Sequence, residues 1–142
     1  QIVGDGSQRM TLEAEVNALG IGSHINFLGF RNDIAQILSA SDIFVLPSRY
    51  ETMPIAILEA MAASLPCVVT NVGENMELIT DGGEGFVISP DDPIALADAL
   101  KKLIADPVLR RRMGQAAYLK SQYCGAAQMV ERTLAVYESL RK

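Results

Sequence analysis

The stretch from Asp42 to Thr70, DIFVLPSRYETMPIAILEAMAASLPCVVT, decides the fold class of this chain. Two short apolar runs, 42–46 and 66–70, flank a segment rich in Ala, Met and Ile that predicts a helix from about Met53 to Ser64. Strand, helix and strand in that order form the repeating unit of a parallel sheet with helices on both faces. The strongly apolar character of 42–46 predicts a central strand, covered on both sides. We therefore expect an α/β fold, a doubly wound parallel sheet of Rossmann-like type.

The same alternation continues on both sides of this stretch. Further strands are predicted at 2–3, 25–28 and 85–88, with helices at about 8–19, 34–38 and after Gly73. The last third of the chain has no strand pattern and predicts three amphipathic helices. These helices cover about Pro93–Ala105, Pro107–Gln122 and Ala126–Leu140. No repeat, low-complexity tract or long linker interrupts the sequence, so we expect residues 1–142 to form a single domain.

Composition narrows the class of protein. Hydrophobic residues make up 49% and charged residues 20%, which is ordinary for a globular domain. The net charge of −5 argues against a nucleic-acid partner, because no dense basic face is available to displace counterions. Cys67 lies in an apolar run and is expected to be a buried free thiol, and its pattern with Cys124 indicates a reducing compartment. No apolar run has the length of a transmembrane segment, and no secretion leader is visible.

Two carboxylates stand out in the central stretch. Glu59 is the only charged residue of a segment that is otherwise apolar, so it is expected to be buried and to need a polar partner. Glu51 lies in the loop before the same helix, at the edge of the sheet where ligands of such folds bind. The residues alone leave a structural alternative open. Glu59 could pair with Arg49 or extend into solvent, and Glu51 could cap the helix.

Taken in order, these residues resemble a known family. The segment Ser48–Pro54 followed by Glu59–Ala62 resembles the E-x7-E region of glycosyltransferase family 4, a group of retaining enzymes with the GT-B fold. The resemblance extends over nearly the whole chain and includes the following segments: Gly4-Asp5-Gly6, Ile25–Gly29, Ala40–Ser48, Pro66–Val69, Gly73, Glu77–Ile79, Asp81-Gly82 and Gly85-Phe86. The chain is thereby identified as similar to the carboxy-terminal, nucleotide-sugar-binding domain of such an enzyme.

The resemblance implies a donor site that needs no metal or other cofactor. Glu59, at the second Glu of the motif, is expected to bind the ribose hydroxyls of a UDP-, GDP- or ADP-linked sugar. Glu51, at the first Glu, and its neighbours Thr52, Met53 and Pro54 are expected to bind the donor sugar. The N-terminus of the following helix favours the adjacent diphosphate.

Further positions follow from the same resemblance. The loop at Phe30 and Arg31 is expected to lie beside the nucleobase, and Gly4, Gly6 and Gly73 are expected to line the cleft. No residue is assigned a catalytic or a metal-binding role, because the leaving diphosphate is expected to help deprotonate the acceptor.

The sequence departs from the family at three places. Thr52 stands where the family has Gly, Ser64-Leu65-Pro66 replaces a Gly-containing turn, and Glu74 replaces the second residue of a Gly-Gly pair. Thr52 and Glu74 add bulk, and Glu74 adds negative charge, where the sugar diphosphate is expected to approach. These changes put the identity of the donor sugar in question.

The beginning of the chain suggests that it is part of a longer protein. It opens without an initiator Met, apparently within a strand, and lacks the strand and loop that carry the diphosphate-binding Arg and Lys of the family. The acceptor-binding amino-terminal domain is also expected to be missing. We expect a cytoplasmic location, with any association with a membrane surface made through that absent domain.

Three hypotheses follow for the function. The chain is the donor-binding half of a retaining glycosyltransferase that transfers a hexose to a glycan, lipid or small molecule, and is inactive alone. Alternatively, it is a stand-alone nucleotide-sugar-binding or regulatory module, or it is a fragment of a related sugar-nucleotide epimerase. A reading frame continuous with a first domain favours the enzyme, whereas turnover of a nucleotide sugar without an acceptor favours the epimerase.

Overall fold

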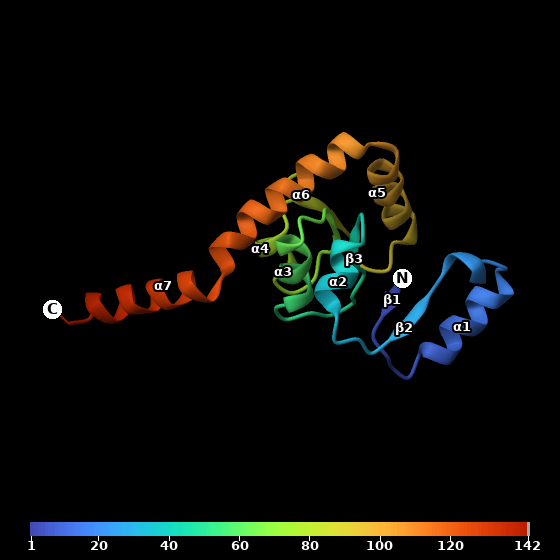
Figure 1. The fold of residues 1–142 in the computed structure, drawn as a ribbon, viewed down its shortest axis with the longest axis horizontal. Helices are drawn as coiled ribbons and strands as arrows, with labels where there is room; N and C mark the ends of the chain where they lie inside the picture. Colours follow the sequence, from blue (N-terminus) through green and yellow to red (C-terminus); the bar gives the residue numbers. More distant parts are fainter. Residues whose placement is uncertain (142) are drawn as a thin grey trace. The chain divides into compact units, whose positions relative to one another are not determined.

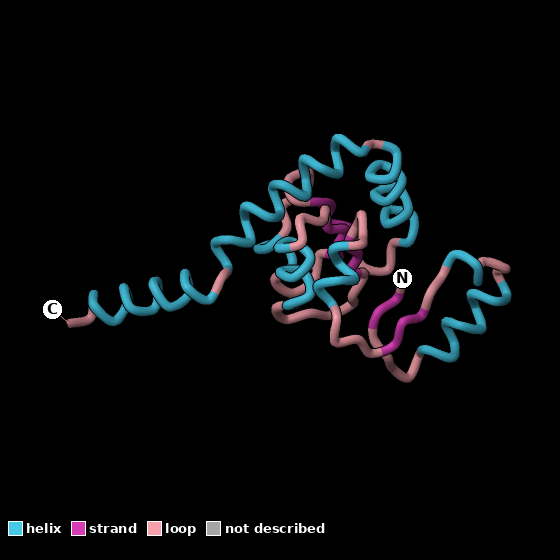
Figure 2. Tube along the Cα trace, in the orientation of Figure 1, coloured by secondary structure: helices cyan, strands magenta, loops and turns pink. Residues whose placement is uncertain are grey.

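A computed structural model describes residues 1–141, with the backbone alone described at 126 and 127. The chain divides into two compact units, one formed by Gln1–Ile34 and a second that begins at Ala35 (Figure 1). Helices and strands alternate along the chain as far as Ile88, and helices follow after it (Figure 2). The predicted α/β class with parallel strand pairing is therefore confirmed, and the described strands form two sheets, one in each unit.

The first unit contains one strand–helix–strand element. Strand β1 (Ile2–Val3) is followed by helix α1 (Arg9–Ala18), a short 3-10 helix at Gly22–His24 and strand β2 (Phe27–Gly29). The two strands pair in parallel, with Ile2 opposite Phe27. The predicted strand at 25–28 thus begins two residues later and includes Gly29.

The second unit is built on a three-stranded parallel sheet. Its strands are β3 (Phe44–Leu46), β4 (Cys67–Thr70) and β5 (Gly85–Ile88), in the order β3-β4-β5. Strand β4 is buried at every position, whereas β3 is half-buried. The prediction that 42–46 is the central strand of its sheet is wrong, because β4 takes that place.

Helices cover this sheet and follow it. They are α2 (Ile34–Ser39), α3 (Ile55–Ala62), α4 (Asn75–Leu78), α5 (Pro93–Ala105), α6 (Pro107–Ser121), the 3-10 helix Gln122–Cys124 and α7 (Ala126–Ser139). Two of them begin with the same chemistry. The Asp92 carboxylate accepts from the Ala95 N–H and the Asp106 carboxylate accepts from the Val108 and Leu109 N–H groups, each just before a proline. The three predicted C-terminal helices are confirmed to within a residue or two.

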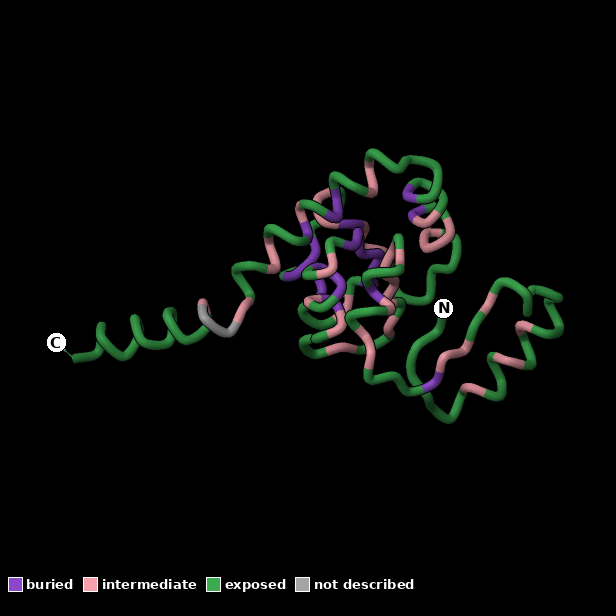
Figure 3. Tube along the Cα trace, viewed as in Figure 1, coloured by how far each residue is buried: buried purple, intermediate pink, exposed green. Residues whose placement is uncertain are grey.

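The hydrophobic core of the second unit lies between β4 and the helices α5 and α6. Val68, Ala99, Leu103 and Met113 form one buried cluster. Figure 3 colours the buried parts of the chain purple. Their burial removes apolar surface from water, at about 25 cal/mol per Å² of that surface. The core therefore packs the central strand β4 against the two helices that follow the sheet.

Helix α3 meets α6 through backbone at one point. A Cβ added to Gly114 in α6 would lie 2.1 Å from the carbonyl oxygen of Ser64, so only glycine permits this approach. Ser64 itself has a φ of 60°, a left-handed conformation that side chains disfavour. This residue occupies the place where the resembling family has glycine.

None of the helices within residues 1–141 combines the length and the apolar character needed to cross a lipid bilayer.

Candidate functional site

The loop after β3 carries the first predicted carboxylate. Glu51 is half-buried, and its Oε1 accepts a hydrogen bond of 2.7 Å from the Ser48 hydroxyl. Thr52 and Met53 are exposed, and Pro54 is buried. Pro54 is the residue before helix α3 (φ −77°, ψ 109°), so this helix begins two residues after the predicted start at about Met53. The loop therefore offers the Glu51 carboxylate and two exposed residues at the carboxyl end of a strand.

Gly73, in the loop after β4, contacts the Glu51 loop. Its φ is +53°, and an added Cβ would lie 2.1 Å from the carbonyl oxygen of Glu51. The next residue fastens the two loops together, because the Glu74 N–H donates to the Thr52 carbonyl at 3.2 Å. The structure thus brings three predicted positions, Glu51, Thr52 and Gly73, into one place. The two family departures Thr52 and Glu74 are joined by that bond.

Beneath these loops lies a set of buried polar residues that the sequence did not single out. Thr70 is 2% exposed, and its hydroxyl donates to the Ser48 carbonyl at 2.6 Å. Asn75 is fully buried, and its Nδ2 donates to the Thr70 carbonyl at 2.8 Å. For Thr70 the sequence offered one signal, a threonine at the end of an otherwise apolar strand. No signal in the sequence pointed to Asn75.

Glu59 is exposed, contrary to the prediction that it is buried. Helix α3 buries Ile57, Ala60 and Met61 on one face, while Ile55 on the other face is 69% exposed. The apolar composition of the helix therefore did not require burial on all sides. The carboxylate is therefore in contact with water in the free chain, and burial no longer supplies an argument for a partner.

The alternative pairing of Glu59 with Arg49 is also not seen. Arg49 Nε instead donates to Asp91 Oδ1 at 2.7 Å, across 42 positions of sequence. Glu59 lines an open pocket of about 410 Å³ at the ends of α6 and α7. Its other lining residues are Leu58, Ala62, Ser121, Gln122, Cys124, Gly125 and Gln128. The carboxylate is thus accessible to a polar ligand.

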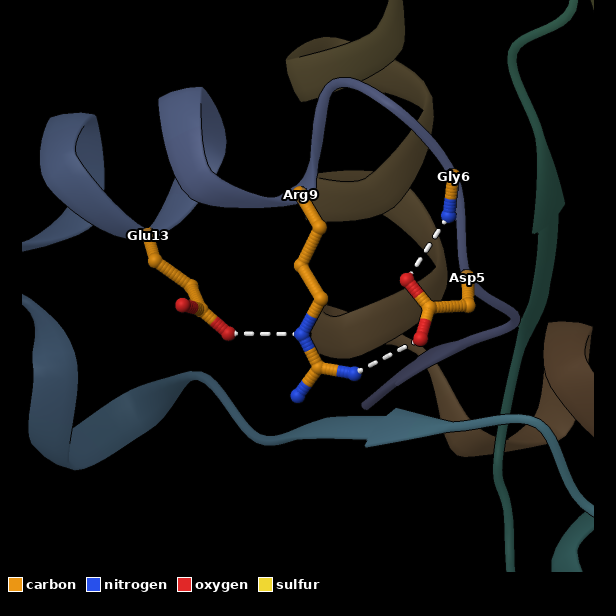
Figure 4. Close-up of polar contacts among 4 residues, drawn as sticks. All are labelled: Asp5, Gly6, Arg9 and Glu13. Carbon is orange, nitrogen blue, oxygen red and sulfur yellow. Dashed lines mark hydrogen bonds and ion pairs between the residues drawn. The ribbon is translucent and has the colours of Figure 1, made fainter.

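In the first unit, the glycine turn after β1 is organised by Asp5. The Asp5 carboxylate accepts from the Gly6 N–H at 2.8 Å and from Arg9 at 3.4 Å, and Arg9 also donates to Glu13 at 2.8 Å (Figure 4). Gly4 has a φ of +114° and donates its N–H to the Gly29 carbonyl. Arg9 is therefore engaged by two acids, and the cleft-lining role of Gly4 and Gly6 stays a prediction.

The predicted nucleobase loop lies after β2. Phe30 is 80% exposed, and Arg31 Nε donates to Asp33 Oδ1 at 2.8 Å. The hydrogen bond from Arg31 lowers the pKa of the Asp33 carboxyl, and the same contact raises the pKa of Arg31. This pair is exposed at the surface, where such ion pairs contribute little to stability. The nucleobase role of Phe30 and Arg31 stays a prediction.

Other chemistry is limited in the described chain. Within residues 1–141, no group of three or more His, Cys, Asp or Glu side chains is placed to hold a metal ion. Cys67 is a buried free thiol, as predicted, and burial raises its pKa to about 12. Cys124 is a free and exposed thiol.

An α/β unit whose strand ends carry glycine-rich and acidic loops belongs to the class of folds that bind nucleotides there. The chain belongs to the glycosyl transferases group 1 family, whose sequence model matches residues 1–120. This confirms the resemblance to the GT-B glycosyltransferases of group 1 at the level of family and fold. Of the predicted function, membership of the glycosyltransferase family is confirmed.

Individual relatives agree with this assignment. A UDP-Gal:alpha-D-GlcNAc-diphosphoundecaprenol alpha-1,3-galactosyltransferase from Escherichia coli is 42% identical over 109 residues, which are 76% of this chain and 28% of the relative. Anabaena Alr3699/HepE, solved in complex with UDP-glucose, superposes with a TM-score of 0.87 at 29% identity, over 96% of this chain and 40% of that one.

A second structure similar to this chain is that of a carboxy-terminal domain solved by itself. The C-terminal domain of a glycosyl transferase group 1 protein (LpcC) from Francisella tularensis superposes with a TM-score of 0.75 at 32% identity, over 80% of this chain and 60% of that one. The present chain spans only 28% to 31% of the length of three curated relatives.

Proposed function

We propose that residues 1–142 are the donor-binding, carboxy-terminal domain of a retaining glycosyltransferase. In this proposal the whole protein transfers a hexose from a nucleoside diphosphate sugar to a glycan, lipid or small-molecule acceptor held by another domain. The observation that carries it is the junction of the Glu51 loop with Gly73, at the carboxyl ends of β3 and β4. Ligands of open parallel sheets bind at this edge. The UDP-glucose complex of HepE, a structure of the same fold, supports a nucleotide sugar as the ligand.

Each carboxylate has a distinct task in this proposal. Glu59 is accessible on α3 and accepts hydrogen bonds from the two ribose hydroxyls. Glu51 accepts from hydroxyls of the hexose, while Ser48 holds one of its oxygens and leaves the other free. The exposed residues Thr52 and Met53 lie at the same end of the loop and contact the sugar. Charge-assisted hydrogen bonds of this kind are about twice as strong as neutral ones.

The chemical step follows from positioning. The bond from the anomeric carbon to the diphosphate oxygen breaks, and the acceptor oxygen forms the new bond on the same face of the sugar. The acceptor proton goes to the leaving diphosphate, so neither Glu51 nor Glu59 needs to act as nucleophile or base. The contribution of this chain is to fix the donor in a reactive geometry and to stabilise developing charge.

The test uses the glutamate that the proposal places at the ribose. Binding of UDP, GDP and ADP to the chain is measured by ligand-observed NMR, for wild type and for Glu59→Ala. We expect one nucleotide to bind best and Glu59→Ala to weaken it about 10- to 100-fold, because a hydrogen-bonded charged group is lost. Glu138→Ala serves as the control, since Glu138 is also an exposed helical glutamate.

Two results would contradict the proposal. Unchanged affinity in Glu59→Ala shows that the ribose assignment is wrong. An equal loss in Glu138→Ala shows that the effect is one of general charge and not of a site.

A further inference from the structure

A line of hydrogen bonds leads from the protein interior to the Glu51 carboxylate. Asn75 Nδ2 donates to the Thr70 carbonyl at 2.8 Å, and the Thr70 hydroxyl donates to the Ser48 carbonyl at 2.6 Å. The Ser48 hydroxyl then donates to Glu51 Oε1 at 2.7 Å. These hydrogen bonds join each residue in the line to the next, and the last residue carries the carboxylate assigned to the donor sugar.

Stability does not explain why an asparagine occupies position 75. Its Oδ1 is buried and has no hydrogen-bond partner among the described residues. The Thr70 carbonyl that it contacts also accepts from the Val72 N–H at 2.9 Å, and so stays satisfied without it. A buried unsatisfied acceptor is costly, while one redundant hydrogen bond contributes little. An apolar residue of similar size would serve the fold as well.

Thr70 has a more direct connection to the loop. It is the last residue of β4, and its hydroxyl reaches across to the backbone that leaves β3. Thr70 as a whole residue is only 2% exposed. Water therefore does not replace this hydrogen bond when the hydroxyl is removed. The bond ties the path of the backbone at Ser48 to the rigid, fully buried central strand.

We propose that Thr70 is a positioning residue, supported by Asn75, that sets the orientation of the Glu51 carboxylate through Ser48. The inference rests on the proposed function, because it takes Glu51 to bind the donor sugar. Thr70 touches no ligand and acts only by holding the loop. Removal of its hydroxyl frees the Ser48 backbone and allows the Glu51 carboxylate to rotate away from the sugar hydroxyls.

The measurement separates the sugar from the nucleotide. The dissociation constants of UDP and of UDP-glucose are determined for each variant of the chain. The Kd of UDP divided by the Kd of UDP-glucose, called the sugar ratio, reports how much the sugar contributes to binding, and it falls when that contribution is lost. Thr70→Val removes the hydroxyl with little change of shape, and Thr70→Ser restores it. Urea unfolding of each variant gives its stability independently.

Matched controls exist for the other two positions. Ser48→Ala is compared with Ser41→Ala, because the Ser41 hydroxyl is also half-buried and also makes a single 2.7 Å bond, to the Ile37 carbonyl, with no link to Glu51. Asn75→Leu removes both the amide bond and the orphaned oxygen.

We expect Thr70→Val, Ser48→Ala and Asn75→Leu to lower the ratio, by about tenfold for the first two. Their affinity for UDP alone should stay within about twofold of wild type, because the Glu59 contact is untouched. Thr70→Ser and Ser41→Ala should keep the wild-type ratio. Asn75→Leu should be as stable as wild type, or more so, which a purely structural role would not give.

The outcomes distinguish the two proposals. If Glu51→Gln does not change the ratio in the wild-type background, the sugar role of Glu51 fails and the positioning role fails with it. If Glu51→Gln lowers the ratio but Thr70→Val leaves it intact, only the positioning role is overturned. Parallel losses of UDP and UDP-glucose affinity in Thr70→Val would equally refute it, since they indicate general disruption.

Discussion

Replacement of Gly73 by alanine tests the contact between the two loops of the site. Gly73 has a φ of +53°, and its added Cβ would lie 2.1 Å from the Glu51 carbonyl oxygen and 2.8 Å from the carbonyl carbon. An alanine at positive φ costs about 1–2 kcal/mol. The overlap requires the Glu51 loop to move by more than 1 Å to reach ordinary contact, and such overpacking adds about 1–3 kcal/mol. The free energy of unfolding should therefore fall by about 2–5 kcal/mol.

Gly82 supplies a matched control for this substitution. Its φ is +78° and it is exposed like Gly73, but nothing lies within 4 Å of its added Cβ. Gly82→Ala should consequently show only the backbone cost of about 1–2 kcal/mol. The difference between the two variants isolates the steric contact with the Glu51 loop.

Urea unfolding of both variants measures the stability difference. The Kd of UDP divided by the Kd of UDP-glucose measures the effect of each substitution on sugar binding. Gly73→Ala should lose the sugar contribution, because a displacement of more than 1 Å moves the Glu51 carboxylate out of hydrogen-bonding distance of the sugar hydroxyls. Gly82→Ala should retain it. Equal destabilisation of the two variants would show that the Glu51 carbonyl does not lie against Gly73, and the reasoning about the joined loops would be refuted.

Three further predictions concern stability and reactivity. Ser64→Gly should raise the free energy of unfolding by about 0.5–1 kcal/mol in a urea titration, because Ser64 has a φ of 60° that glycine adopts freely, and a loss of stability would contradict this. Mass spectrometry after alkylation of the native protein should find Cys124 modified and Cys67 unmodified until urea unfolds the chain, since burial raises the Cys67 pKa to about 12; simultaneous labelling would show otherwise. Burial opposes ionisation of Glu84, but the Thr80 N–H and the Lys120 ammonium outweigh it and hold its pKa below the ordinary value. The stability that Glu84 contributes should thus be present above about pH 4.3 and disappear as the pH falls through its lower pKa in the folded state. The free energies of unfolding of wild type and Glu84→Gln, measured against pH, should therefore converge in acid. A difference that stays constant with pH would contradict this account.

Local chemistry made the C-terminal helices predictable. Asp92-Pro93 and Asp106-Pro107 each place a capping carboxylate directly before a residue suited to the first turn, and both helices begin at the proline. Strand β5 was predicted at its observed bounds because turn residues enclose a short apolar run. Signals of this kind lie within a few residues of the element that they define.

The predictions that failed depended on tertiary packing. The sequence of α3 is apolar on every side, and only the folded chain shows that Ile55 and Glu59 lie on an uncovered face. Likewise, no local pattern could have indicated that Arg49 pairs with Asp91 and not with Glu59. The family motif located Glu51, Glu59 and Gly73, but the buried support from Thr70 and Asn75 became visible only when β3 and β4 were placed side by side.

The approach of Gly114 to the Ser64 carbonyl has a consequence for exchanging parts between family members. Side-chain interfaces can be repacked after a graft, because rotamers adjust to a new neighbour. Backbone set against backbone has no such freedom, and here an added methyl group would fall 2.1 Å from an oxygen. A chimera that takes α6 from one parent and the α3–β4 turn from another should therefore fold only where the incoming helix also carries glycine at this position. Where the incoming helix lacks this glycine, viable crossover points lie outside the segment that joins Ser64 to Gly114.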